Sequence, residues 1–166
     1  MARLVLVGLP GVGKTTVARL LAAQWKCDAI DTDDLLSDAV GCPAPEFLRR
    51  EGVAAFRLAE LDALREALKG DAVVATGGGV VTSPEARKFL VDEVTLWLDC
   101  DDATLVPRLG GVERPLLGDD PASSLRRLRS EREAFYQEVA RACVDASGDE
   151  REVAARVADT LSQVTK

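Results

Sequence analysis

GLPGVGKT, residues 8–15, matches the pattern G-x-x-x-x-G-K-[ST], in which a glycine-rich loop joins a strand to a helix. The apolar run before it predicts a strand over residues 3–7, and the helical period after it predicts a helix over residues 14–24. The glycines let successive backbone N–H groups point at phosphate oxygens, and the helix N-terminus adds its partial positive charge. The stretch therefore predicts a loop that binds nucleotide phosphates.

The side chains at the end of this loop predict the chemistry of the nucleotide site. Lys14 would reach the β- and γ-phosphates, and Thr15 would ligate Mg²⁺. The chain has no N-K-x-D signature for guanine, which favours ATP as the nucleotide. The residues expected to bind the nucleotide at this loop are Gly11, Val12, Gly13, Lys14, Thr15 and Thr16.

Short apolar runs alternate with longer segments of helical period over the rest of the chain. The predicted strands cover residues 3–7, 28–31, 72–75, 94–98 and 143–145. The predicted helices cover residues 14–24, 53–69, 83–90, 102–109, 123–140 and 149–163. Such alternation is typical of a parallel sheet with crossover helices. We therefore expect one domain over residues 1–166, an α/β fold of three layers (α/β/α) with a five-stranded parallel sheet.

Two segments interrupt the alternation. Residues 33–52 predict one or two short helices, broken at Gly41, Pro43 and Pro45. Residues 110–121 are rich in glycine and proline, and they are about as long as a typical active-site lid. Ligands of open α/β sheets bind beyond the carboxyl ends of the strands, so both segments are expected to handle substrate.

Composition excludes several other classes of function. The formal net charge is −7, which argues against nucleic acid or an anionic membrane as a partner. The chain has no histidine, which removes histidine bases and histidine-ligated metals, and its four cysteines lack C-x-x-C spacing and are expected to be reduced. We find neither a secretory leader nor a run near the roughly 20 apolar residues of a spanning helix, and we expect a cytoplasmic protein.

Further polar and glycine residues follow the predicted strands. Asp31 and Asp33 are two residues apart, so both carboxylates can face one pocket, one holding Mg²⁺ through water and the other accepting a hydroxyl proton. Residues 77–79, GGG, would let backbone N–H groups approach a ligand closely. The arginines expected to build a positive site are Arg57, Arg114 and Arg132, whereas solvated helix faces are expected for Arg65, Arg127 and Arg156.

Taken in order along the chain, these motifs resemble those of shikimate kinase, a small member of the nucleoside monophosphate kinase-like P-loop fold. The motifs are residues 8–15, Asp31-Thr32-Asp33, Phe56-Arg57 with Glu60, Gly77-Gly78-Gly79, Arg114-Pro115-Leu116 and Arg132-x-x-x-Tyr136. The resemblance covers nearly the whole chain. It implies transfer of the ATP γ-phosphoryl group to the 3-hydroxyl of shikimate, with Mg²⁺, by a monomer. It also implies an acceptor-binding subdomain at about 33–60 and a lid at about 109–121.

The resemblance implies a role for each candidate residue. Asp33 would help deprotonate the attacking hydroxyl, and Asp31 would orient the waters on Mg²⁺. Lys14 and Arg114 would neutralise charge on the transferring phosphoryl group. Arg108 would lie against the adenine, with residues 147–151 closing the other side. The residues expected to bind shikimate are Asp33, Arg57, Gly77, Gly78, Gly79 and Arg132, the arginines as a clamp on the carboxylate.

The segment after the second predicted strand departs from the family pattern. Ser37 stands where many relatives carry Glu, Val53 stands in place of a Glu after Gly52, and Leu48 aligns with an aromatic residue. Two alternatives are therefore kept: a kinase of another hydroxylated carboxylate such as gluconate, and a non-catalytic nucleotide-binding regulatory module. The paired arginines and the glycine triplet favour shikimate. The presence of Lys14 together with the other catalytic candidates favours an enzyme.

Overall fold

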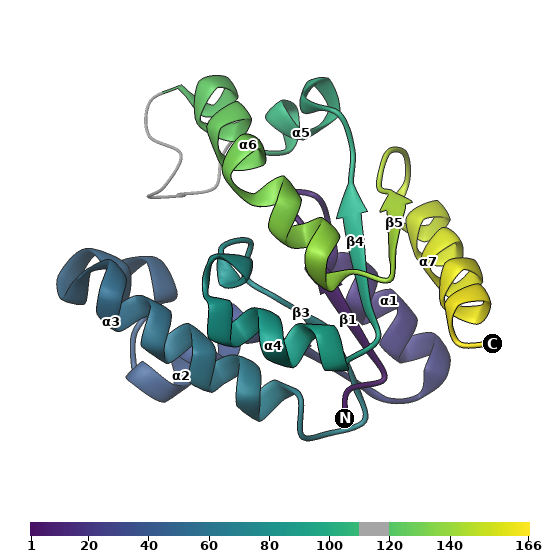
Figure 1. The fold of residues 1–166 in the computed structure, drawn as a ribbon, viewed down its shortest axis with the longest axis horizontal. Helices are drawn as coiled ribbons and strands as arrows, with labels where there is room; N and C mark the ends of the chain where they lie inside the picture. Colours follow the sequence, from purple (N-terminus) through teal and green to yellow (C-terminus); the bar gives the residue numbers. More distant parts are fainter. Residues whose placement is uncertain (110–119) are drawn as a thin grey trace.

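The computed structural model of the chain describes residues 1–109 and 120–166. Five strands form one sheet in the order β2-β3-β1-β4-β5, and every neighbouring pair is parallel (Figure 1). The strands are β1 (Leu4–Val7), β2 (Asp28–Asp31), β3 (Ala72–Ala75), β4 (Thr95–Asp99) and β5 (Ala142–Asp145). β1 and β3 are apolar and buried throughout, because helices cover both faces of the sheet.

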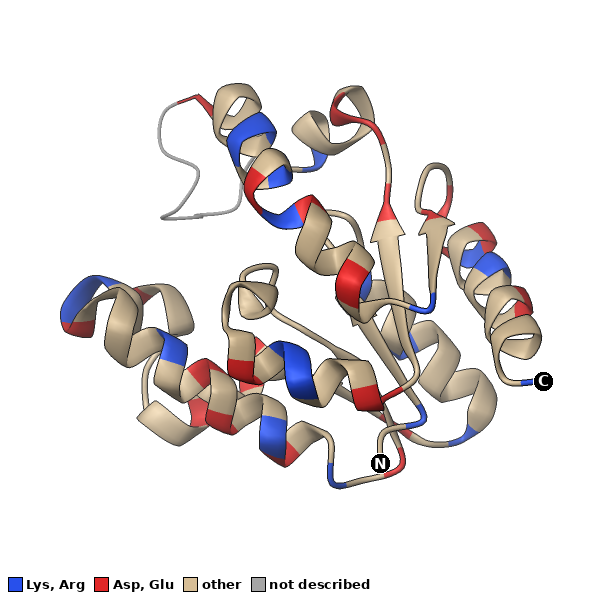
Figure 2. Ribbon diagram, in the orientation of Figure 1, with Lys and Arg blue, Asp and Glu red and all other residues tan. Residues whose placement is uncertain are grey.

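The helices form the two outer layers. α1 and α7 contact each other on one face of the sheet, and α6 contacts α4 and β4 on the other. Figure 2 shows that most charged residues lie on these helices. The helices are α1 (Lys14–Trp25), α2 (Thr32–Val40), α3 (Ala44–Ala67), α4 (Pro84–Asp92), α5 (Asp102–Arg108), α6 (Pro121–Val139) and α7 (Glu150–Val164), with a short 3₁₀ helix, η1 (Val80–Thr82). The predicted three-layer α/β fold with a five-stranded parallel sheet is confirmed.

The register of the sheet brings the ends of three strands together. Ala75 of β3 lies opposite Leu6 of β1 and opposite Asp31 of β2. The glycine-rich loop after β1, the carboxylates after β2 and the glycine triplet after β3 therefore meet at one edge of the sheet. This edge is where ligands bind in open α/β sheets.

The segment after β2 differs in detail from the prediction. α2 ends at Gly41, which has a φ of 74°, so the predicted break at this glycine is confirmed. Pro45 does not break a helix, because it lies in the first turn of α3, where a missing N–H costs no hydrogen bond. The interruption lies instead at Gly52, whose φ of 86° and ψ of 174° kink α3 into two pieces. The predicted helix from Val53 is the second of these pieces.

Two separate groups of buried apolar residues stabilise the molecule. The main core lies between the sheet and its covering helices. A small second cluster joins α2 to α3 and consists of Leu36, Ala44, Phe56 and Ala63. Residues 110–119, with Arg114 and most of the predicted lid, lie outside the described residues. No helix in the described part of the chain is long and apolar enough to cross a membrane.

Candidate active site

One pocket of about 740 Å³ lies at the edge of the sheet where the strand ends meet. Its walls come from the loops after β1, β3 and β5, from the end of β2, and from α1, α2, α3, α5, α6 and α7. Every candidate site residue from the sequence lines this pocket, except Arg114, which lies outside the described residues. The residues concerned are Gly11, Val12, Gly13, Lys14, Thr15, Thr16, Asp31, Asp33, Arg57, Gly77, Gly78, Gly79, Arg108 and Arg132.

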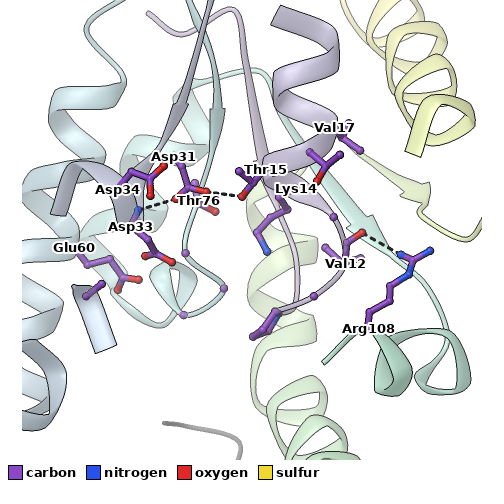
Figure 3. A pocket seen from close by; sticks show the side chains of 18 of the residues that line it. Val12, Lys14, Thr15, Val17, Asp31, Asp33, Asp34, Glu60, Thr76 and Arg108 are labelled. Atoms are coloured by element: carbon purple, nitrogen blue, oxygen red, sulfur yellow. Dashed lines mark hydrogen bonds between the residues drawn. The ribbon is translucent and has the colours of Figure 1, made fainter. Parts of the chain in front are cut away.

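The loop after β1 has a backbone geometry that suits phosphate. Gly13 caps α1 with a φ of 104°, a conformation that residues with a Cβ rarely adopt. Lys14 is only 7% exposed, and its Nζ donates to the carbonyl oxygens of Gly8 at 2.8 Å and Leu9 at 3.0 Å. These bonds hold the ammonium group across the loop, at the centre of the pocket (Figure 3).

Thr15 and Asp31 form an oxygen-lined site beside the loop. Thr15 Oγ1 donates to Asp31 Oδ2 at 2.5 Å, and Asp31 Oδ1 accepts from the backbone N–H of Asp33 at 2.9 Å. Hydroxyl and carboxylate oxygens suit Mg²⁺, which binds proteins through one or two carboxylates together with substrate phosphates. Among the described residues no group of three or more carboxylate, cysteine or histidine side chains could hold a metal alone. The donor set fits an ion that arrives with a nucleotide.

Asp33 lies between the phosphate loop and the opposite wall of the pocket (Figure 3). Burial and, after it, the neighbouring carboxylates of Asp31 and Glu60 together raise the pKa of its carboxyl to about 6, against the opposing effect of Lys14. A Cβ on Gly77 would lie 2.8 Å from both Asp33 Oδ1 and Glu60 Oε1. Glycine at this position therefore leaves room for the two carboxylates.

Two arginines flank a buried glutamate on that opposite wall. Arg57 Nη1 donates to Glu60 Oε2 at 2.6 Å, and Glu60 is only 3% exposed. Burial raises the pKa of Glu60, while the guanidinium groups of Arg57 and Arg132 act in the opposite direction. Arg132 is 4% exposed, and its Nε has no hydrogen-bond partner within residues 1–109 and 120–166. Two guanidiniums against one ionised carboxylate leave an excess positive charge, which suits a ligand carboxylate.

The glycine triplet packs closely against its neighbours. A Cβ on Gly79 would lie 2.5 Å from both terminal nitrogens of Arg57, so only glycine lets the guanidinium lie there. Tyr136 Oη donates to the carbonyl oxygen of Gly78 at 2.6 Å, and the Tyr136 ring stacks on Trp97 with centroids 5.8 Å apart. Burial raises the pKa of Tyr136 to about 12, so the hydroxyl stays a donor. α6 therefore supports the triplet as well as supplying Arg132.

Arg108 lies on the other side of Lys14 from Asp33 (Figure 3). Its Nη1 donates to the carbonyl oxygens of Ala146 at 3.1 Å and Val12 at 3.4 Å. The guanidinium thus joins the phosphate loop to the loop after β5. Its predicted contact with adenine stays a prediction.

The structure adds residues that sequence reasoning did not assign to the site. Glu60 was recognised only as part of a motif, although a glutamate three residues after Arg57 on a helix is placed to pair with it. Thr76, which is buried, and Ser37 and Leu48 also line the pocket. Ser37 Oγ donates to the Asp33 carbonyl oxygen at 2.7 Å and accepts from the Ala44 N–H at 3.0 Å, linking α2 to α3.

One expectation about the arginines is wrong. Arg156 does not extend from a solvated helix face, because it donates to the backbone carbonyl oxygens of Asp145 and Ser147. Arg127 meets the expectation, since its side chain is 62% exposed.

Comparisons with known proteins agree with this geometry. Residues 10–162 match the family model described as shikimate kinase. The shikimate kinase of Synechococcus elongatus is 38% identical over 167 residues, covering 98% of this chain and 88% of the relative. That of Corynebacterium efficiens is 39% identical over 143 residues, covering 84% of this chain and 85% of the relative.

Solved structures give the same result. Shikimate kinase from Acinetobacter baumannii, in complex with shikimate, has a TM-score of 0.92 and 31% sequence identity, covering 96% of this chain and 92% of that one. A gluconokinase from Sinorhizobium meliloti has a TM-score of 0.66 and 17% identity, covering 98% and 93%, and this likeness shows a shared fold only. The family model, the relatives and the arrangement of the pocket agree, and the chain belongs to the shikimate kinase family.

Proposed function

We propose that this protein transfers the γ-phosphoryl group of ATP to the 3-hydroxyl of shikimate, giving shikimate 3-phosphate and ADP. The observation that supports it best is the wall formed by Arg57, Glu60 and Arg132, which carries excess positive charge and faces the phosphate loop across Asp33. A carboxylate held by the two arginines would place the rest of a small acceptor between Asp33 and Lys14. A hydroxyl group there can reach both the base and the phosphate site.

In this mechanism Asp33 accepts the proton of the attacking hydroxyl. A pKa of about 6 leaves the carboxylate largely ionised at pH 7 while keeping it more basic than an ordinary aspartate. The acceptor oxygen forms a bond to the γ-phosphorus, the bond from that phosphorus to the β–γ bridging oxygen breaks, and ADP leaves. Lys14 neutralises negative charge on the transferring group.

The nucleotide end of the pocket suits ATP with Mg²⁺. Thr15 and, through water, Asp31 would hold the ion, which when bound neutralises charge on the phosphate oxygens. Backbone N–H groups of the loop and the N-terminus of α1 would hold the phosphates. Arg114, in the part of the chain outside the described residues, stays the candidate for a second cation on the phosphoryl group.

The proposal is tested by ADP release with ATP and Mg²⁺, measured side by side with shikimate, with gluconate and with no acceptor. We expect rapid release that depends on shikimate. ADP release with gluconate but not with shikimate would show that gluconate, or a similar carboxylate, is the acceptor. Tight ATP binding without ADP release would show that the chain is a nucleotide-binding module. The cytoplasmic location, the monomeric state and the absence of nucleic-acid or membrane partners stay predictions, to be checked by fractionation, light scattering and binding assays.

A matched pair of variants on α6 tests the carboxylate clamp. Arg132→Met should raise the KM for shikimate about ten- to a hundredfold, because a charge-assisted hydrogen bond contributes about 1.5–3 kcal/mol. Arg127→Met removes an equal charge from an exposed position on the same helix and should leave that KM unchanged. Equal effects of the two substitutions would refute a specific clamp.

A further inference from the structure

An arginine of α7 holds one side of the segment at residues 145–148, which comprises the last residue of β5 and the first three of the loop that leads to α7. Arg156 donates through Nη1 to the carbonyl oxygen of Asp145, and through Nη2 to that of Ser147 at 2.7 Å. The guanidinium also lies 3.6 Å from Asp145 Oδ2 and 4.0 Å from Glu152 Oε2. Figure 2 shows that basic and acidic positions occur together on the part of α7 near β5. The side chain thus binds the backbone of the loop as well as surface carboxylates.

An arginine of α5 holds the other side of the same loop. Arg108 donates to the carbonyl oxygens of Ala146 at 3.1 Å and Gly148 at 3.2 Å. Along residues 145–148, alternate carbonyl oxygens thus face Arg156 and Arg108. All four carbonyl oxygens of the loop therefore accept a hydrogen bond from a guanidinium group.

Two backbone N–H groups of the loop also have partners. The N–H of Ala146 donates to Asp99 O at 2.8 Å, and the N–H of Ser147 donates to Asp145 Oδ1 at 2.9 Å. Gly148 has a φ of 90°, and a Cβ there would lie 2.8 Å from Glu152 Oε2. Charge-assisted bonds on both sides and a glycine-only position hold the loop in one conformation without a ligand.

This loop forms the wall of the pocket beyond the phosphate site. Ala146 and Gly148 line the pocket together with Arg108 and the phosphate-loop residue Val12. Shikimate would bind at the opposite end, beside Asp33. A nucleotide whose phosphates lie at Lys14 therefore has its base and ribose directed to this wall. Arg156 is not among the described residues that line the pocket. It can therefore act on a bound nucleotide only through the loop.

We propose that Arg156 is a positioning residue for the nucleoside part of ATP, because it fixes the loop at 145–148 before the nucleotide binds. A loop that is already ordered loses less conformational entropy when a ligand binds against it, so binding is tighter. This inference rests on the proposed function only in taking a nucleotide as the ligand, and it does not depend on the acceptor.

The test compares Arg156→Gln and Arg156→Lys with Arg127→Gln, an exposed arginine distant from the loop in the chain. Calorimetric titration gives the Kd for ADP and for inorganic pyrophosphate, which reaches the phosphate loop but has no base. Both substitutions of Arg156 should raise the Kd for ADP about tenfold, because neither side chain replaces the planar fork that bonds two carbonyls. The Kd for pyrophosphate and the KM for shikimate at saturating ATP should stay within about twofold of wild type, as should all values for Arg127→Gln.

Three results would overturn the proposal. The first is an unchanged Kd for ADP in an Arg156→Gln protein that unfolds at the wild-type temperature. The second is an equal loss of pyrophosphate affinity, which would indicate a general charge effect. The third is wild-type ADP affinity in Arg156→Lys, which would show that a positive charge at this position is enough to order the loop. If Arg156→Gln fails to fold, the Arg156→Lys protein is used for the same test. ADP binding needs neither shikimate nor turnover, so failure of the proposed activity would be recognised separately.

Discussion

Replacing Asp33 with Asn should make the protein more stable and much less active. Surrounding protein and nearby carboxylates raise the pKa of this group from its ordinary value of 3.8 to about 6. A pKa difference of about two corresponds to about 3 kcal/mol between the charged and the neutral carboxyl. Because the side chain of Asp33 is open to water in the pocket, solvent screening reduces the expected effect to about 1–2 kcal/mol.

The sign of this effect depends on pH. A carboxylate whose pKa rises on folding destabilises the folded protein above that pKa, and the loss fades as the pH falls toward the pKa of the unfolded chain. Asparagine does not titrate. The variant Asp33→Asn should therefore exceed the wild type in free energy of unfolding by about 1–2 kcal/mol at pH 7.5, and by about half of that at pH 5.

Urea unfolding at the two pH values measures this difference, and steady-state assays measure the activity. The turnover number should fall at least about a hundredfold, the usual scale for loss of a general base. Asp38→Asn is the control, because Asp38 is exposed on the same helix, α2, and is not among the described residues that line the pocket. Two stability results would refute the conclusion that burial and nearby carboxylates raise the pKa of Asp33. One is equal stability of Asp33→Asn and wild type at pH 7.5, and the other is a stability difference that does not change with pH. An unchanged turnover number would remove Asp33 from proton transfer.

Three further outcomes follow from the same geometry. Gly79→Ala should raise the KM for shikimate at least about tenfold and leave the KM for ATP unchanged, because its Cβ would displace the Arg57 guanidinium; steady-state kinetics showing equal changes would contradict this. Tyr136→Phe should lower the free energy of unfolding by about 1–3 kcal/mol in urea titrations, because the Gly78 carbonyl loses its donor, and an unaffected midpoint would argue against that bond. The wild-type kcat/KM for shikimate should be half-maximal near pH 6 and fall about tenfold per pH unit below it, since Asp33 must be ionised, whereas a flat profile from pH 5 to 7 would exclude this base.

Most of the fold could be predicted from local sequence. β2 and β3 have the predicted bounds, because each is a short run bounded by turn residues or charged residues. The parallel arrangement follows from the helical segments between strands, since parallel neighbours need long crossovers. The helices that follow the kink in α3 begin or end one or two residues away from their predicted bounds. Capping contacts decide where a helix ends, and the periodic pattern does not show them. Ser83 caps α4, with its Oγ accepting from the N–H of Ala86.

The segment between β2 and the long helix was predicted less well. Proline and glycine both interrupt helices, and their spacing alone does not say which of them lies in a first turn. Pro45 is compatible with α3 because α3 begins one residue earlier, whereas Gly52 interrupts it. The start of α3 depends on Ser37, which accepts from the Ala44 N–H across the gap between the two helices. Such contacts between elements are not encoded in a local pattern.

Local sequence was enough to predict the phosphate loop, the parallel sheet and most residues around the pocket, because glycine spacing and apolar periodicity act over a few neighbouring positions. Which charged groups meet became known only from the folded molecule. It places Glu60 between two arginines from different helices and raises the pKa of Asp33 through burial and through carboxylates from other elements. It also brings Arg156 into hydrogen-bond contact with the backbone of a loop. Electrostatic energy and burial depend on distances through space, which the order of residues along the chain does not specify.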